Sequence, residues 1–183
     1  MKFSYSWLCD HLETDKNATE IGDALTNLGL ELESLTDYSS YSKFVVATIK
    51  DFHKHPNADR LNICTVDDGT KTYQVICGAN NVKKGLKGIF AKDGMYIPGT
   101  QIYLKKGKIR GEISEGMLLS ERELNLSDDH DGIIELSDNF ENGTSAIDAL
   151  KLNDPVFEIG ITPNRGDCLG VRGVARDLSA KGI

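Results

Sequence analysis

The hydrophobic pattern of the 183-residue chain has a helical period near the N-terminus and changes to a strand pattern after Gly29. Asn17 and Glu20 have the spacing of a capping box, and Gly29 suits the left-handed position that ends a helix. Between them, four apolar residues share the spacing of one buried helical face: Ile21, Ala24, Leu25 and Leu28. Leu30 and Leu32 then alternate with glutamates, as in a half-buried strand. Helices and one strand cannot enclose a core alone, so this segment needs a partner.

The middle of the chain has the pattern of several short strands. Turn dipeptides such as Asp68-Gly69, Asp93-Gly94 and Pro98-Gly99 separate its apolar runs. The runs that predict strands are residues 44–52, 61–67, 72–77, 87–91, 101–104, 117–119 and 133–136, followed by a short helix around residues 145–150. Short strands with no long helix among them predict a small barrel.

The last segment returns to the pattern of the first. Phe157, Ile159 and Ile161 alternate as a strand, and a helix is predicted from about Leu169 to Ala180. These elements supply the missing partners, so we expect an α+β, mainly β fold in which a β-barrel is inserted into a small discontinuous α/β domain. The predicted halves of that domain are residues 1–38 and 152–183, and the predicted barrel domain is residues 39–151. The chain stops just after a helix, so we expect it to be a fragment of a longer protein.

Composition argues against a membrane or secreted protein. No apolar run approaches the roughly 20 residues of a membrane span. The segment Met1–Tyr5 lacks the apolar core of a signal peptide. The four cysteines are scattered, which fits reduced core thiols: Cys9, Cys64, Cys77 and Cys168. We therefore expect a cytoplasmic protein.

Charge is unevenly distributed along the chain, whose net charge is -7. Residues 83–110 contain eight basic residues and one acidic residue, whereas residues 111–150 contain eleven acidic residues and one basic residue. Four of the cations follow a strand-like alternation: Lys105, Lys106, Lys108 and Arg110. On one face of a strand they would neutralise phosphates, with the arginine adding a bidentate fork. The alternative is a solvated strand edge.

A second candidate set is Asn80, Asn81 and Lys83, which follow a predicted strand in a loop that a barrel can turn toward a ligand. The alternative is a structural turn. Aromatic residues that could stack on bases are few: Tyr73, Phe90, Tyr96 and Tyr103. We therefore expect phosphate and shape contacts with RNA rather than sequence-specific reading of bases.

Metal and catalytic motifs are weak. His53 and the segment His55–Asp59 fit no zinc spacing, so a rigid corner is the better interpretation. The segment Ser127–Gly132 resembles a calcium loop only faintly, and an acidic turn is favoured. The chain has no phosphate-binding loop, nucleophile elbow or HExxH motif, and Cys168 has no histidine close in sequence. We expect neither a catalytic residue nor a metal site.

Five segments carry a resemblance to a known family. His55–Leu61, Val75–Asn81 and Lys108–Leu118 together resemble the tRNA-binding oligonucleotide/oligosaccharide-binding (OB) barrel appended to several aminoacyl-tRNA synthetases. The flanks, Met1–Leu8 and Ile161–Gly170, resemble those of bacterial phenylalanyl-tRNA synthetase beta subunits. The resemblance implies an N-terminal tRNA-binding and structural region, with the barrel as the inserted domain.

The resemblance also implies partners and cofactors. The partners are tRNA, the alpha subunit of an α2β2 tetramer and the remainder of the beta subunit, with no membrane. The full enzyme is a phenylalanine–tRNA ligase that uses ATP and magnesium in protein biosynthesis. This fragment alone is expected to have no cofactor and no catalytic activity. Two alternatives stay open, a free-standing OB-type tRNA-binding protein and an assembly scaffold without RNA affinity.

Overall fold

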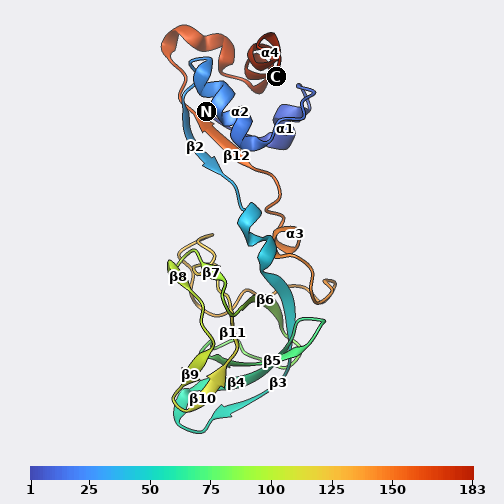
Figure 1. The fold of residues 1–183 in the computed structure, drawn as a ribbon, viewed down its shortest axis with the longest axis vertical. Coiled ribbons are helices and arrows are strands. Elements are labelled where there is room, and N and C mark those ends of the chain that lie inside the picture. The colour runs from blue at the N-terminus through green and yellow to red at the C-terminus, as the bar shows by residue number, and fades with distance from the viewer. The chain divides into compact units, whose positions relative to one another are not determined.

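A computed structural model describes residues 1–183 and divides them into two compact units. The terminal unit comprises Met1–Ser39 together with Lys151–Ile183, and the barrel unit comprises Ser40–Leu150 (Figure 1). One unit is therefore built from two stretches that the other unit separates in sequence. None of the helices combines the length and the apolar content that crossing a membrane requires.

The terminal unit is built on an antiparallel sheet with the strand order β1, β12, β2. Its elements in chain order are β1 (Lys2–Ser4), α1 (Tyr5–Cys9), α2 (Ala18–Asn27), β2 (Leu32–Thr36), β12 (Val156–Ile159), the 3₁₀ segment η2 (Pro163–Cys168) and α4 (Val171–Ala180). The strand from the C-terminal stretch lies between the two strands from the N-terminal stretch. The sheet therefore needs both stretches.

The helix predicted from the capping box is confirmed as α2. The Asn17 side chain accepts a hydrogen bond from the Glu20 N–H at 3.0 Å, and the Glu20 carboxylate accepts one from the Asn17 N–H at 2.9 Å. The buried face of the helix, including Leu25, belongs to the same apolar cluster as Phe157 of β12. Phe157 also stacks on Phe3, with ring centroids 5.2 Å apart. Burying each such side chain stabilises the unit by about 1.5–3 kcal/mol.

The barrel unit contains a five-stranded antiparallel sheet with the order β11, β6, β3, β4, β5. Its strands in chain order are β3 (Val45–His55), β4 (Ala58–Asp67), β5 (Thr72–Cys77), β6 (Lys87–Lys92) and β11 (Gly116–Leu118). The two ends of the sheet approach each other, because the Glu115 N–H donates to the Gln74 carbonyl at 2.9 Å. The Ile76 N–H also donates to the Ser114 hydroxyl at 3.1 Å. The sheet is nearly closed, and the predicted OB-type barrel inserted into a small α/β domain is confirmed.

Two short hairpins occupy the connection from β6 to β11, and both lie on the same side of the barrel unit in the view of Figure 1. The remaining elements of the unit are η1 (Ser39–Lys43), β7 (Tyr96–Ile97), β8 (Ile102–Tyr103), β9 (Gly107–Ile109), β10 (Glu112–Ser114) and α3 (Ala146–Leu150). The strand predicted at residues 133–136 is wrong. The Ile134 N–H donates to the Leu119 carbonyl at 2.9 Å, whereas the Leu136 N–H donates to the Lys87 carbonyl at 2.8 Å. Because these bonds reach different segments, no continuous ladder forms.

Candidate nucleic-acid interface

The predicted cations lie in what we call the basic hairpin, residues 105–114, which contains β9 and β10. Its register pairs Ile109 with Glu112, which leaves Arg110 and Gly111 as a two-residue turn. Both turn residues have positive φ angles, 50° and 103°. A type I′ turn requires such angles at both central positions. The turn places Arg110 at the exposed tip of the hairpin.

The hairpin tip is fixed to the corner between β3 and β4. The Nε2 atom of His55 lies 3.1 Å from the Ile109 carbonyl oxygen, and its Nδ1 atom accepts the Asn57 N–H at 3.0 Å. Because Nδ1 accepts, Nε2 carries the hydrogen and donates it to Ile109. The Asn57 side chain adds a bond to the Arg110 carbonyl at 3.2 Å. Both nitrogens of the buried imidazole are thus engaged by the backbone, which supports the interpretation of this segment as a rigid corner.

All four predicted cations of the hairpin are exposed, but they are not equivalent. Lys106 forms an ion pair with Glu115, with 2.7 Å between its Nζ atom and Oε1. The other three form no ion pair within the chain: Lys105, Lys108 and Arg110. Three free positive charges therefore remain for an anionic partner.

The prediction that the four cations lie on one face of a single strand is wrong. Only Lys108 lies within β9, since Lys105 and Lys106 precede the strand and Arg110 occupies the turn. The turn shortens the strand because its two residues adopt positive φ angles. The cations are consequently distributed along the hairpin instead of in a single row.

One carboxylate of the basic hairpin, Glu112, and the carboxylate of Glu115, which directly follows it, are directed toward Gln74 on β5. The Gln74 side-chain amide lies 3.5 Å from a Glu112 carboxylate oxygen, and the Gln74 N–H donates to the Glu115 carboxylate at 3.3 Å. Hydrogen bonds from Lys106 and from the Gln74 N–H lower the pKa of Glu115. These contacts tie the acidic side chains to the barrel wall, beside the free cations.

The second predicted set is placed differently from the hairpin. The Asn81 side chain donates to the Ile133 carbonyl at 2.9 Å and accepts the Ile133 N–H at 3.0 Å, so it closes a loop. Lys83 forms an ion pair with Glu135. Asn80 is exposed. The structural alternative therefore accounts for Asn81, and this loop is tied to residues 133–135 rather than to the basic hairpin.

Two cations beside the corner were not predicted from the sequence. Lys54 precedes His55 directly, and Arg60 follows it on β4; both are exposed and neither forms an ion pair. They lie outside the basic run at residues 83–110, so charge counting did not single them out. The pairing of the corner with Ile109 brings their segment to the hairpin.

A pocket of about 220 Å³ separates the basic hairpin from β5. Its wall combines the apolar side chains of Ile76 and Ile109 with Lys105, Lys108 and Ser114. An apolar surface bordered by lysines suits an anionic ligand with flat apolar parts, such as a nucleotide. Ile76 and Met117 also line a second pocket of about 220 Å³.

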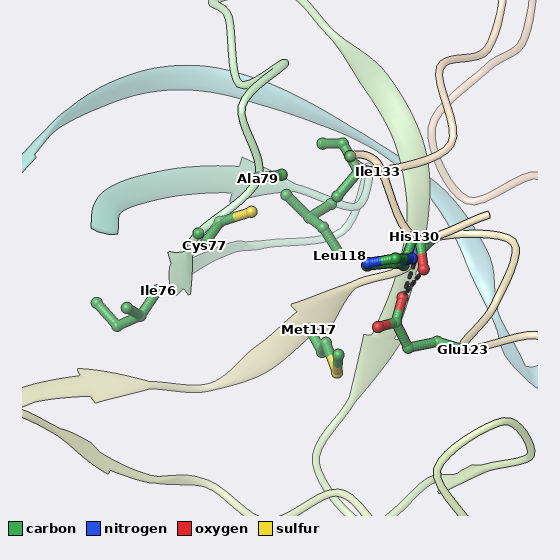
Figure 2. Close-up of a pocket in the computed structure, with 11 residues that line it drawn as sticks. Ile76, Cys77, Ala79, Met117, Leu118, Glu123, His130 and Ile133 are labelled. Carbon is green, nitrogen blue, oxygen red and sulfur yellow. Dashed lines mark hydrogen bonds between the residues drawn. The ribbon is translucent and has the colours of Figure 1, made fainter. Parts of the chain in front are cut away.

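The second pocket offers binding surface rather than reactive groups. Figure 2 shows Cys77 and Leu118 among its apolar residues and His130 and Glu123 at one side. Burial raises the pKa of the Cys77 thiol, which disfavours the reactive thiolate. The Glu123 carboxylate accepts the Ser120 N–H at 2.6 Å and also the Ser120 hydroxyl, so it is engaged within the chain.

Comparison with known proteins gives one family match. Residues 44–145 match the family described as a putative tRNA binding domain. The chain is 50% identical over 184 aligned residues to the phenylalanine–tRNA ligase beta subunit of Brucella abortus (strain 2308), covering 100% of this chain and 23% of that protein. For the same subunit from Bartonella henselae the identity is 53%, again over 184 residues, 100% of this chain and 23% of that protein. The chain thus spans about a quarter of the length of these relatives.

A solved structure was also matched. The MetRS related protein from Pyrococcus horikoshii is 22% identical to the chain and aligns with a TM-score of 0.41, over 56% of this chain and 87% of that protein.

Proposed function

We propose a function for this chain from the premise that it belongs to the putative tRNA-binding domain family and corresponds to the N-terminal region of the phenylalanine–tRNA ligase beta subunit. The proposed function is binding of tRNA by the barrel unit, through phosphate contacts at the basic hairpin. Identity over the whole chain to a region of a longer subunit favours this function over that of a free-standing tRNA-binding protein.

The bond between His55 and Ile109 is the observation that carries the proposal. His55 is the last residue of β3, where the chain turns into β4, and Ile109 lies in the connection from β6 to β11. In chain order these are the connections between the first and second and between the fourth and fifth strands of the five-stranded sheet. In OB folds these two connections and the face of the second and third strands bind oligonucleotides. The bond holds both connections together and presents the hairpin cations beside that face.

Phosphate contacts account for the chemistry of the free side chains. Lys105 and Lys108 supply point charges, and the planar guanidinium of Arg110 can hold two phosphate oxygens at once. Residues 105–114 contain four cations and a single carboxylate, that of Glu112, so the basic hairpin would attract phosphate although the whole chain carries a net charge of -7. Neutralising phosphates gives affinity with little dependence on sequence.

The activity of the whole protein is a further part of the proposal. By the name of its relatives, the longer subunit would serve the joining of phenylalanine to tRNA. Dependence on ATP and magnesium, and a cytoplasmic location, are further parts of this proposal. Its protein partners would be an alpha subunit, in an α2β2 tetramer, and the remainder of the beta subunit. The barrel and terminal units would contribute RNA binding and structure, not catalysis.

A cluster of potential metal ligands in the terminal unit does not suit magnesium. The closest group of potential ligands is Asp167, Cys168 and Asp177, whose donor atoms lie within 4.8 Å of one another. Arg165 and Arg176 each form ion pairs with both carboxylates, so the acidic charge that magnesium needs is neutralised. No step of the proposed activity is therefore assigned to these residues.

Titration of fluorescently labelled tRNA with the chain tests the proposal. The variant Lys108→Glu should weaken binding markedly. Lys84→Glu, which makes the same charge change at another exposed and unpaired lysine, should weaken it little. Equal weakening by both variants would show that only overall charge matters. Absence of binding by the unaltered chain at low salt would favour the scaffold without RNA affinity.

A further inference from the structure

The hairpin formed by β7 and β8 exposes two aromatic rings side by side. Tyr96 and Tyr103 are cross-strand partners, so their side chains share one face. Their ring centroids lie 5.2 Å apart, and the side chains remain 44% and 67% exposed. By contrast, Tyr41 and Tyr73 are buried. Two neighbouring aromatic rings left in water form an unpartnered surface.

The tyrosine pair borders a pocket of about 200 Å³. Its other side chains are mainly apolar: Tyr41, Phe44, Met95 and Pro98. The Tyr41 hydroxyl donates to the Leu124 carbonyl at 2.5 Å and its ring meets Phe44 edge-on at 5.7 Å, so the floor is fixed. The charged residue in the pocket wall is Lys43, which forms no ion pair.

The tyrosine pair continues directly into the basic hairpin. The Leu104 N–H donates to the Met95 carbonyl at 2.7 Å and the Lys106 N–H donates to the Asp93 carboxylate at 2.5 Å. These bonds hold the segment after Tyr103 against residues 93–95. At about 3.3 Å per extended residue, Tyr103 and Lys108 are separated by up to about 17 Å. A single RNA strand lying along this segment would place several nucleotides there.

We infer that Tyr96 and Tyr103 form a stacking platform for unpaired bases of an RNA strand whose phosphates lie along Lys105 and Lys108. The inference rests on the proposed function and deepens it, since phosphate contacts alone need no base. Charge complementarity selects the occupant: the surface is aromatic, the unpaired cation of Lys43 lies in its wall, and the unpaired Lys105 follows Tyr103 by two residues. A single-stranded polyanion with flat apolar bases meets both features.

The experiment compares two labelled oligonucleotides by fluorescence anisotropy with the full 183-residue chain. One is an oligoadenylate of about 12 nucleotides, within the usual site size of an OB fold. The other is an abasic strand of the same length and charge. The unaltered chain should bind the oligoadenylate about tenfold more tightly, because stacking one base contributes about 1.4 kcal/mol or more.

Three variants separate stacking from folding and from phosphate contacts. Tyr103→Ala should remove most of the tenfold preference and leave the salt dependence of binding unchanged, whereas Tyr103→Phe should keep the preference. The matched control is Ile102→Ala, which removes a neighbouring side chain that is 56% exposed and points to the other face. This control should behave as the unaltered chain does.

Two outcomes would overturn the inference in distinguishable ways. If both oligonucleotides bind equally well and with the same salt dependence, phosphate binding stands and base stacking is refuted; the tyrosines would then be a protein contact. If neither oligonucleotide nor tRNA binds at low salt, the proposed function and the inference fail together.

Discussion

The imidazole of His55 donates a hydrogen bond to the carbonyl oxygen of Ile109, 3.1 Å from Nε2, while its other nitrogen accepts the Asn57 N–H. The two residues are 54 positions apart in sequence, yet this bond fixes the tip of the basic hairpin to the first corner of the barrel. Since His55 is only 4% exposed, water cannot replace either bond. The position of the cations therefore depends on a buried side chain that need not touch RNA.

Removing this side chain should loosen the hairpin. His55→Ala eliminates two hydrogen bonds at a buried site and should lower the free energy of unfolding by about 2–3 kcal/mol. Amide hydrogen exchange at residues 107–112 should become faster, and tRNA affinity should fall. His53→Ala, at an exposed position on the same strand, is the control and should change neither property. Unchanged exchange in His55→Ala would mean that the corner does not hold the hairpin.

The charge and the conformation of Arg110 can be separated. Asparagine before glycine is favoured in type I′ turns, so Arg110→Asn should keep the turn and cost no stability. RNA affinity should nevertheless fall, because the guanidinium is lost. Urea unfolding and tRNA titration of the same preparation measure the two effects. A variant that loses stability but retains affinity would show that Arg110 serves the turn alone.

The ion pair of the buried Asp68 with the partly exposed Lys92, with 2.6 Å between Nζ and the carboxylate, predicts an acid-sensitive barrel. Burial alone would raise the pKa of Asp68. Hydrogen bonds from Lys92, the Lys71 N–H and Thr70 outweigh burial and hold this pKa well below its usual range. Stabilisation is therefore complete above the unfolded-state pKa of about 3.9 and is lost as pH falls toward the lower folded-state value.

Asp68→Asn isolates this contribution. It should destabilise the chain by about 2–3 kcal/mol near neutral pH. The difference from the unaltered chain should shrink below about pH 4, where the carboxylate becomes protonated on unfolding. Urea unfolding over this pH range provides the measurement. A difference that stays constant with pH would assign the effect to shape and hydrogen bonding instead of charge.

The terminal unit should lose its fold when β12 is weakened. Phe157 is fully buried in the middle strand of that sheet, so Phe157→Ala should destabilise the unit by about 3–5 kcal/mol. The chain has a single tryptophan, Trp7, which lies in this unit, and its fluorescence reports there alone. The fluorescence transition should move to lower urea while tRNA binding by the barrel unit persists. If Phe157→Ala abolished tRNA binding at the same urea concentration at which the tryptophan fluorescence changes, the two units would not unfold independently.

Regular periodicity made much of the fold predictable. The capping box at Asn17 and Glu20, the alternation at Phe157 and Ile159, and the apolar runs of the barrel all depend on local sequence, and the structure contains the corresponding elements. The hairpin turn was less visible, because Arg110-Gly111 differs from the Asn-Gly and Asp-Gly pairs that mark a type I′ turn.

The chemistry of individual side chains was less predictable, because it depends on distant pairing. Lys106 is neutralised by Glu115 only in the observed register of the hairpin. Asn81 is occupied by Ile133, which lies 52 positions later in the chain. Composition shows how many cations a segment has, but only the folded structure shows which of them remain free.

The salt dependence of tRNA affinity tests the central claim most directly. Three free cations on the basic hairpin predict a slope of about -2 for log affinity against log salt, at about 0.7 per neutralised phosphate of a single strand. The double variant Lys108→Ala/Arg110→Ala should reduce the magnitude of that slope by about 1.4. Stability should change little, because both side chains are exposed. A binding constant independent of salt, or a slope unchanged in the double variant, would mean that the hairpin is only solvated surface.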